Sequence, residues 1–338
     1  MDPLQISRES IFISAIRSFC NAFFAILGIF VCLFIALFFW SGGQEDTSLS
    51  IKPDAEGNKT LLPSSSPVVL KLSIDGIIGT GQLVTSAIET ILSDSRSGPL
   101  NHNRVKAILL YMNTPGGTVT DSNGIYEALL AYKQKHHTPI YAFVDGMCAS
   151  GGMYISSAAD RIYSSPIAMI GSVGVILGPA FNVRDLFEKW GIKTKIISKG
   201  KDKTLLNPFS TWQPGEDDCL YTMTNYLYEH FVDLVTAART SLNKEKLIND
   251  YGAQVFAPPT AQQFGYIDVA NSSYSETLKA LTQAAGIGET SPYQVVELTL
   301  NKPLLSELIE SNNRLSFFEK FLPFKEELSD PFLYLYRP

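Results

Sequence analysis

The sequence has few cysteines and few histidines. Its 338 residues include four of each, and no two cysteines form a CxxC pair. The pattern therefore predicts neither a disulfide-rich scaffold nor a Cys/His metal site, and we expect no metal and no cofactor. Cys148 has two interpretations, a small buried residue, which we favour, and a nucleophile. The cysteines are Cys20, Cys32, Cys148 and Cys219.

Excess positive charge is also missing. The 27 Lys and Arg residues are outnumbered by 33 Asp and Glu residues, which gives a net charge of −6. Because no basic stripe with interleaved aromatic residues is present, nucleic-acid binding is not expected. The length allows one large domain or two modest ones, with a proper hydrophobic core.

One long stretch contains no charge at all. Residues 18–40 read SFCNAFFAILGIFVCLFIALFFW, and roughly 20 apolar helical residues suffice to cross a hydrocarbon core of about 30 Å. A cleaved signal peptide is one alternative, but bulky residues continue until Ser41. A buried core helix is the other, but Asn21 is the only polar residue that could contribute to a polar face. We therefore predict a transmembrane anchor at residues 18–40.

The charges on either side of this stretch predict its orientation. Arg8 and Arg17 precede it, whereas Glu45 and Asp46 follow it. By the positive-inside rule, residues 1–17 lie in the cytoplasm and everything after the anchor lies outside. We expect a single-pass protein of the cell inner membrane with its catalytic domain on the extracytoplasmic (periplasmic) side.

After the anchor the composition changes twice. Residues 41–66 are rich in Ser, Gly, Pro and charge, which predicts a linker. From 67 to 287, apolar strand candidates alternate with stretches of helical period, which predicts an α/β fold with a mostly parallel sheet and crossover helices. Residues 288–338 form a C-terminal extension with a strand candidate and an amphipathic, aromatic-rich stretch, and their function is not readable. The strand candidates are 68–74, 105–112, 140–144, 173–177 and 194–197, and the helix candidates are 82–92, 122–135, 151–159, 181–190, two within 215–250, one within 258–270, and 275–285.

Two of the predicted strands end in glycine-containing turns, and sites gather at strand ends of parallel sheets. The first turn contains Gly116 and Gly117, where backbone amides can approach a ligand closely because no side chain blocks them. A helix begins just after, and its N-terminal amides favour negative charge. A simple turn is the alternative interpretation.

The second turn leads to Ser150. We expect the strand to break at Asp145-Gly146, so that Ser150 stands at a strand-to-helix corner. Such a corner exposes a hydroxyl and lends the next amide, that of Gly151, to an oxyanion. The stretch is not a GxSxG motif, and a plain helix N-cap is the alternative role for this serine.

A serine nucleophile needs a base. None of the histidines stands in a motif with an acidic partner, so we do not expect a Ser-His-Asp triad. A neutral lysine can take this role, but Lys199, Lys201 and Lys203 lie in one short stretch, and composition does not select among them. The histidines are His102, His136, His137 and His230.

Four blocks together resemble the signal peptide peptidase SppA (protease IV) family in its half-length, single-repeat form. In chain order they are NTPGGTVTDSNGIYEAL, ASGGMYISSAADRIYSSPIAMIGSVGVI, GKDKTLLNPF and YGAQVFAPPTAQQFGYIDVA. The resemblance covers about residues 67–287 and implies a crotonase/Clp-protease-like fold.

The resemblance also implies roles for individual residues. The serine of the family's ASGGYY block is the nucleophile and corresponds to Ser150. The second basic residue of its G-[RK]-x-K-[ST] block is the general base and corresponds to Lys203. Ser172, in GSVGVI, matches a residue that orients this lysine. The implied oxyanion donors are the backbone amides of Gly151 and of the glycine pair, Gly116 in preference to Gly117.

The activity that this implies is that of a serine endopeptidase acting through an acyl-enzyme on hydrophobic peptides such as signal-peptide remnants. A homo-oligomeric ring is implied as well, in which serine and lysine come from adjacent subunits. Met153 and Asp202 stand where the family has aromatic residues, and an ionised Asp202 close to Lys203 would favour the charged, inactive amine. A catalytically impaired membrane scaffold of the same fold therefore stays an alternative, as does an acyl-CoA enzyme of the crotonase superfamily.

Overall fold

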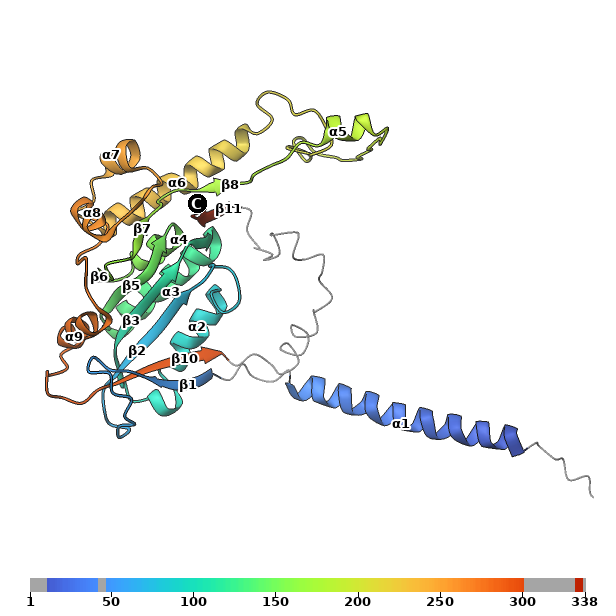
Figure 1. Cartoon of the computed structure of the whole chain (residues 1–338), viewed down its shortest axis with the longest axis horizontal. Helices are drawn as coiled ribbons and strands as arrows, with labels where there is room; N and C mark the ends of the chain where they lie inside the picture. The colour runs from blue at the N-terminus through green and yellow to red at the C-terminus, as the bar shows by residue number, and fades with distance from the viewer. Residues whose placement is uncertain (1–10, 42–46, 301–331, 337–338) are drawn as a thin grey trace, which may run out of the picture. The chain divides into compact units, whose positions relative to one another are not determined.

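The computed structural model describes residues 11–41, 47–300 and 332–336, and they belong to two units. Figure 1 shows the helices and strands, most of them labelled. The first unit contains helix α1 (Ile11–Ser41). Its segment Ala15–Leu33 is long and apolar enough to cross a membrane, and no other helix among the described residues is. The predicted anchor is compatible with this helix, although a signal sequence would have the same properties.

The second unit is built on a mixed sheet of eight described strands, in the order β1-β10-β2-β3-β5-β7-β9, with β6 paired to β5. The pairs β10–β2, β2–β3, β3–β5, β5–β6 and β5–β7 are parallel, whereas β1–β10 and β7–β9 are antiparallel. The predicted mostly parallel sheet is thus confirmed. The strands are β1 (Thr47–Lys52), β2 (Val68–Asp75), β3 (Val105–Thr114), β5 (Ile140–Ala149), β6 (Arg161–Ser164), β7 (Met169–Gly171), β9 (Val255–Phe256) and β10 (Gln294–Leu300).

Helices cover both faces of this sheet, which explains why its central strands are nearly continuous apolar runs. Alternate residues of β2 show the two layers. Leu70 and Leu72 join the core cluster that contains residues of α2 (Thr85–Asp94), α3 (Val119–His136), α4 (Gly151–Ser156) and α6 (Asp218–Ala238). Val69 joins the cluster that contains residues of α9 (Tyr274–Ala284).

A second, smaller sheet has the order β4-β11-β8. Its edges are β4 (Gly116–Thr118) and β8 (Ile176–Leu177), and its centre is β11 (Phe332–Leu335). Both pairings are antiparallel. Residues near the C-terminus therefore lie between two strands that come from the predicted peptidase domain.

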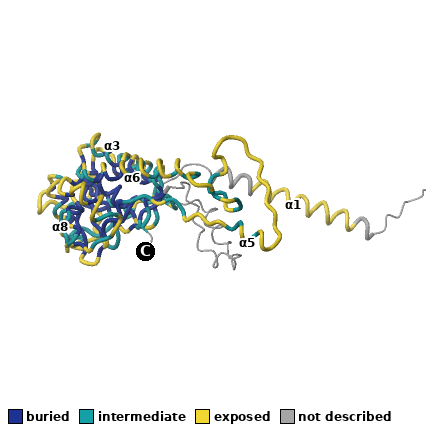
Figure 2. Tube along the Cα trace, turned by 90° about the horizontal axis from the view of Figure 1, so that it is seen from above, coloured by how far each residue is buried: buried dark blue, intermediate teal, exposed yellow. Residues whose placement is uncertain are grey.

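Residues 178–217 form an arm that contains α5 (Arg184–Lys189) and no buried residue (Figure 2). The chain then continues through α6, α7 (Lys244–Lys246), a π-helical turn (Leu247–Tyr251) and α8 (Pro258–Phe264). The predicted helices are present, with boundaries that differ by a few residues.

The short strands β4, β6, β7, β9 and β11 were not predicted, and four other features differ from the prediction. Thr47–Lys52 lies inside the predicted linker but pairs as β1 with β10. Val173–Leu177 is a strand only at its last two residues. The predicted strand 194–197 is irregular, because this part of the arm is exposed and offers it no partner strand. Strand β5 does not break at Asp145-Gly146 but runs on to Ala149, and a register shift against β3 occurs there instead.

The predicted C-terminal extension begins within the main unit. Its strand candidate is β10, which lies between β1 and β2 in the sheet. The predicted amphipathic stretch at 303–324 and most of the predicted cytoplasmic segment lie outside the described residues.

Candidate active site

Ser150 stands at the corner between β5 and α4, as predicted. Its backbone has φ 53° and ψ −114°, a conformation that residues other than glycine rarely adopt and that costs of the order of 1–3 kcal/mol. The corner is held by the Ser150 amide, which donates to the Gly171 carbonyl at 2.9 Å. The Ser150 side chain does not cap α4. Its hydroxyl lies 3.5 Å from the Gly174 carbonyl, a long hydrogen bond that leaves Oγ weakly held.

The two glycines after Ser150 allow α4 to pack closely. A Cβ at Gly151 would overlap the Ser122 hydroxyl, and a Cβ at Gly152 would lie 2.8 Å from Thr114 Cγ2. Larger residues would push the start of α4 away from α3 and from the end of β3. The pair therefore fixes the position of the helix N-terminus that follows Ser150.

Ser172 lies next to the corner that bears Ser150. Strand β7, which ends at Gly171, pairs with the last residues of β5, and Ala149 is opposite Gly171. Ser172 itself is buried, has φ 56° and donates its amide to the Gln254 carbonyl at 2.6 Å. Ser172 is thus a second strained residue beside Ser150. It directly follows Gly171, whose carbonyl accepts the hydrogen bond from the Ser150 amide.

The glycine pair faces the same corner, and its two members have different surroundings. A Cβ at Gly116 would overlap the Tyr334 carbonyl oxygen of β11 and lie 2.8 Å from the Gly151 amide nitrogen. A Cβ at Gly117 would instead overlap the backbone of Ile78. The Gly116 amide already donates to Thr114 Oγ1 at 3.0 Å.

Strand β11 lies in the groove between the glycine pair and β8. Tyr334 is opposite Gly117 and Leu335 is opposite Gly116, and on the other side Leu333 is opposite Ile176. The Tyr334 carbonyl oxygen lies against both Gly116 and Gly151, 3.1 Å from the position of a Cβ at Gly151. A backbone carbonyl thus sits where the two predicted sources of oxyanion donors meet.

The basic candidates are not at this corner. Lys199, Lys201 and Lys203 are exposed and lie in the arm, and no interaction with Ser150 is found for them among the described residues. Asp202, the departure from the family pattern, lies 3.8 Å from Lys201 in an exposed ion pair. Lys203 is therefore exposed on the surface of the arm.

The histidines do not replace the lysine. His102, His136 and His137 precede the N-terminal ends of β3 and β5, whereas Ser150 follows the C-terminal end of β5. His230 is exposed on α6, with its ring 6.3 Å from that of Tyr154. In the described part of the chain no imidazole is hydrogen-bonded to Ser150.

Cys148 is buried and poorly suited to nucleophilic attack. Burial raises the pKa of its thiol to about 12, against a weaker opposing effect of the Ser156 hydroxyl. The thiolate, which is the reactive form, is therefore rare at neutral pH. The structure supports the interpretation of a small buried residue.

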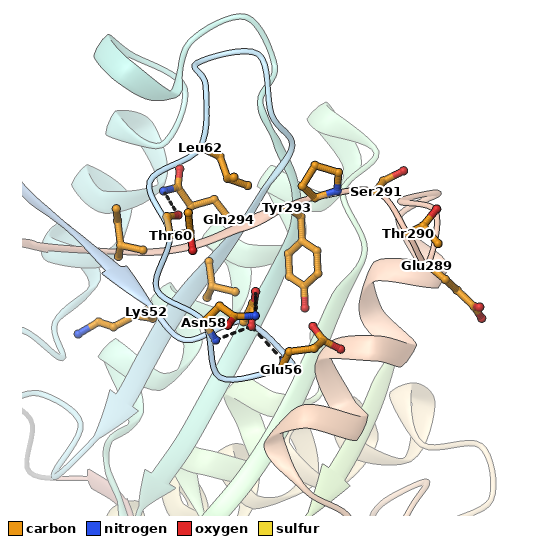
Figure 3. A pocket seen from close by; sticks show the side chains of 14 residues that line it. Lys52, Glu56, Asn58, Thr60, Leu62, Glu289, Thr290, Ser291, Tyr293 and Gln294 are labelled. Carbon is orange, nitrogen blue, oxygen red and sulfur yellow. Dashed lines mark hydrogen bonds between the residues drawn. The ribbon is translucent and has the colours of Figure 1, made fainter.

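Two cavities have different relations to this site. One of about 280 Å³, shown in Figure 3, lies at the C-terminal end of β1 and the N-terminal end of β10, where Gln294 donates to the Thr60 carbonyl. It is at the opposite end of the sheet from Ser150. Another of about 440 Å³ is mostly apolar and continues the β11 groove. It is lined by Leu177 of β8, by Leu205 and Leu206 of the arm, and by Leu220, Tyr221 and Thr224 of α6. No cluster of metal-ligating side chains is found among the described residues.

The sequence analysis missed the C-terminal strand and the face of α6 beside it. The Tyr334 side chain is fully buried, its ring centroid lies 4.4 Å from that of Phe231, and its hydroxyl donates to the Leu227 carbonyl at 3.0 Å. The run FLYLY at 332–336 has the aromatic composition of a strand, and this was the available signal.

Comparisons with known proteins show similarity to a family of peptidases. Residues 131–288 match the model of peptidase family S49. The chain is 28% identical over 269 residues to "Putative protease slr0021" of Synechocystis sp., which covers 78% of this chain and 91% of that protein. It is 29% identical over 234 residues to "Putative signal peptide peptidase SppA" of Enterococcus faecium, which covers 66% of this chain and 67% of that protein. The chain spans less than a quarter of some longer relatives.

Among solved structures, the chain is similar to the 1510-N membrane-bound stomatin-specific protease in complex with a substrate peptide. The match has a TM-score of 0.43 and 16% identity and covers 73% of this chain and 98% of the other. The fold of the present chain rests on its own strand order rather than on this similarity.

Proposed function

We propose that the chain, which matches peptidase family S49 and is similar to SppA-type relatives, is a membrane-anchored serine endopeptidase with a Ser150–Lys203 dyad. A serine-type peptidase follows from the family. The dyad, the hydrophobic peptide substrate and the membrane anchor are the parts that we add.

One observation carries the proposal. Ser150 stands on a strained strand-to-helix corner, and a backbone carbonyl from an extended strand lies against the two glycines beside it. A peptide substrate that adds a strand between β4 and β8 would place its scissile carbonyl in the same position. An acyl-CoA substrate has no backbone to pair with these two strands, so the groove favours a peptidase over an acyl-CoA enzyme.

The chemistry then requires four groups. Ser150 Oγ attacks the carbonyl carbon while neutral Lys203 accepts the hydroxyl proton. Backbone amides at Gly151 and the glycine pair stabilise the oxyanion, each contributing about 2.7–4 kcal/mol to lowering the barrier. Because the Gly116 amide is hydrogen-bonded to Thr114, we assign the donor of the pair to Gly117. Lys203 then gives its proton to the leaving amine, and water hydrolyses the ester.

Lys203 is expected to come from a second copy of the chain. The arm that carries it exposes large apolar side chains, which is unusual unless another surface covers them. Phe181 and Trp190 are each 68% exposed, and Ile197 is 87% exposed. A ring in which each arm reaches the next subunit would bury these side chains, bring Lys203 to Ser150, and place the adjacent Ser172 where it can orient the amine.

The membrane anchor suits the substrate class. Helix α1 is apolar and long enough to hold the peptidase at a bilayer. Hydrophobic peptides released there, such as signal-peptide remnants, would meet the groove without crossing bulk water. The apolar cavity beside β8 fits side chains of that kind.

The test uses the full-length protein in detergent and a fluorogenic hydrophobic peptide. We expect Ser150→Ala and Lys203→Ala each to lower the hydrolysis rate by about 10⁴-fold or more. Lys199→Ala and Lys201→Ala are matched controls, since both lysines are exposed in the same arm, and they should retain most of the activity. Equal activity in all three lysine variants would contradict the assigned base.

Mixing the inactive Ser150→Ala and Lys203→Ala variants tests whether the active site is shared between two subunits or formed within a single chain. In a randomly mixed ring, a site is complete when a Lys203→Ala subunit supplies Ser150 and its Ser150→Ala neighbour supplies Lys203. About a quarter of the sites should then be active. A mixture that stays inactive although the subunits co-assemble would contradict a dyad shared between copies. A scaffold protein would show no activity in any form.

A further inference from the structure

The mostly apolar cavity of about 440 Å³ beside β8 has one charged residue in its lining, Asp217. The other side chains of the lining are aliphatic, aromatic or hydroxylic. They come from β8, from the later part of the arm and from the first turns of α6. A single carboxylate in such surroundings suits a ligand that is apolar over most of its length and carries a positive charge at its end.

The Asp217 carboxylate has no structural role that would explain its presence there. It occupies the N-cap position of α6, where an aspartate usually accepts hydrogen bonds from backbone amides, but its side chain makes no such bond. In the described part of the chain we find no ion pair of this carboxylate either. Its neighbour Glu216 holds the loop instead, accepting from the Leu206 and Gln213 amides at 2.7 and 2.8 Å. The charge of the half-buried Asp217 is therefore open to a ligand.

The cavity adjoins the path of the proposed substrate at two points. Leu177 belongs to β8, one of the two strands between which the substrate strand would lie. Leu205 follows the proposed base Lys203 by two residues. A peptide that is bound for cleavage therefore passes this cavity with one of its side chains.

We propose that the cavity is a subsite for a lysine or arginine side chain of the substrate, and that Asp217 is the residue that makes it specific. The proposal rests on the peptidase function proposed above. The methylene stem of the basic side chain lies along the leucines, as such stems do on apolar surfaces, and the charged head group pairs with the Asp217 carboxylate. Asp217 acts on binding and takes no part in proton transfer.

This subsite narrows the substrate class. A signal peptide has a positively charged segment followed by about 7–15 apolar residues, so a remnant of one offers a basic side chain next to an apolar stretch. The groove would hold the apolar residues while the cavity holds the basic one. A peptide from the middle of a membrane-spanning helix has the apolar residues alone, and we expect it to be cleaved less efficiently.

The test compares fluorogenic peptides that differ at one position, which carries lysine in one peptide and norleucine in the other. Norleucine keeps the methylene stem and lacks the ammonium group. The position is moved along the peptide on both sides of the cleaved bond, and kcat/KM is measured for the full-length protein in detergent. We expect one position at which the wild type prefers lysine by about tenfold, the size of effect of a hydrogen bond between charged groups. Asp217→Asn should lose this preference and hydrolyse the norleucine peptide as the wild type does.

Two further variants distinguish the charge in the cavity from the charge of the helix end. Asp218→Asn is the matched control, because Asp218 is exposed in the first turn of α6 and does not line the cavity. It should keep the preference for lysine. Asp217→Lys should instead prefer glutamate over glutamine at the same position, which a merely structural role of Asp217 would not produce. Added salt should weaken the preference of the wild type, because the pair is only partly shielded from solvent.

Different results would overturn different parts. Equal kcat/KM for the two peptides at every position would refute the subsite and leave the peptidase function standing. A preference for lysine that persists in Asp217→Asn would refute the role of this residue. If the assembled protein hydrolyses none of the peptides, the peptidase function is refuted. Binding of the labelled peptides to Ser150→Ala, measured by fluorescence anisotropy, then still tests the subsite, and equal affinity for the lysine and norleucine peptides would refute it.

Discussion

The carbonyl oxygen of Tyr334 lies so close to Gly116 that a single methyl group on the glycine would overlap it. These residues are far apart in the sequence, and their contact ties the C-terminal strand to the corner that bears Ser150. Gly116 has φ 100°, a conformation that residues with a Cβ rarely adopt. Glycine is therefore required at this position for two reasons: its backbone conformation and the close approach of the strand beside it.

This contact predicts the effect of Gly116→Ala. The new methyl group would exclude any strand from the position of β11, because the atoms it meets are backbone atoms of Tyr334 and Gly151. We expect hydrolysis of the fluorogenic peptide to fall by about 10²-fold or more, because the substrate strand is displaced from its position beside Ser150. Peptide hydrolysis at several substrate concentrations measures the loss.

A matched variant, Gly117→Ala, distinguishes an effect on strand binding in the groove from an effect on the stability of the fold. Its methyl group would overlap the backbone of Ile78, which is part of the permanent structure. We expect a clear drop in melting temperature for Gly117→Ala and a smaller one for Gly116→Ala, where the strained φ costs about 1–3 kcal/mol. Normal peptide hydrolysis by Gly116→Ala would contradict the position assigned to the substrate strand.

Cys148 provides a prediction about chemical reactivity. Because burial raises the pKa of its thiol to about 12, a maleimide at pH 7 should modify the exposed Cys219 and leave Cys148 unmodified in the folded protein. Peptide mapping by mass spectrometry measures both sites, and unfolding in guanidinium should make both reactive. Cys148→Ala should retain most peptidase activity. Loss of activity in that variant with an unchanged melting temperature would reopen the thiol as nucleophile.

Much of the sheet could be predicted because its central strands are locally encoded. The stretches at β2, β3 and β5 are apolar runs; β2 and β3 became strands close to their predicted limits, and β5 begins as predicted and runs five residues further. Strand β1 could not be predicted in the same way. Its sequence is polar and lies in a Ser- and Gly-rich stretch, and it becomes a strand because β10, some 250 residues later in the chain, offers an open edge.

The site shows the same division between local and long-range information. The corner at Ser150 and the two glycine turns are local patterns, and the structure brings Ser150, Gly151 and the glycine pair together. The choice among three exposed lysines is not local, because in the proposed ring it would depend on which of them reaches Ser150 of the neighbouring subunit. The pairing of strand β11 with β4 and β8 could not be predicted from local sequence either. A run of β-forming residues does not reveal which strands it will join.

A polar network on β10 predicts that stability depends on pH. Glu297 is only 8% exposed. Its carboxylate lies 2.6 Å from Lys52 Nζ and 4.0 Å from Lys71 Nζ, and it accepts a hydrogen bond from the Ser73 hydroxyl. Burial alone would raise the pKa of Glu297, but the hydrogen bonds from Lys52 and Ser73 and the charge of Lys71 outweigh it, so the pKa lies below its ordinary value of 4.5. An acid with a depressed pKa in the folded state stabilises the protein above its unfolded pKa, and this stabilisation is lost as the pH falls through the folded pKa.

We therefore expect the melting temperature of the full-length protein in detergent to change little between pH 7 and 5 and to fall below about pH 4.5. Glu297→Gln should melt at a lower temperature at pH 7, because Lys52 and Lys71 lose their carboxylate, and its further decrease in acid should be shallower. The control is Glu56→Gln, which removes one partner of an exposed pair with Lys279 and should change stability by less than about 1 kcal/mol. Melting curves of the three proteins at about pH 7, 5, 4 and 3.5, the range over which this carboxylate is protonated, measure the difference. Parallel acid profiles for wild type and Glu297→Gln would show that this carboxylate does not control the pH dependence.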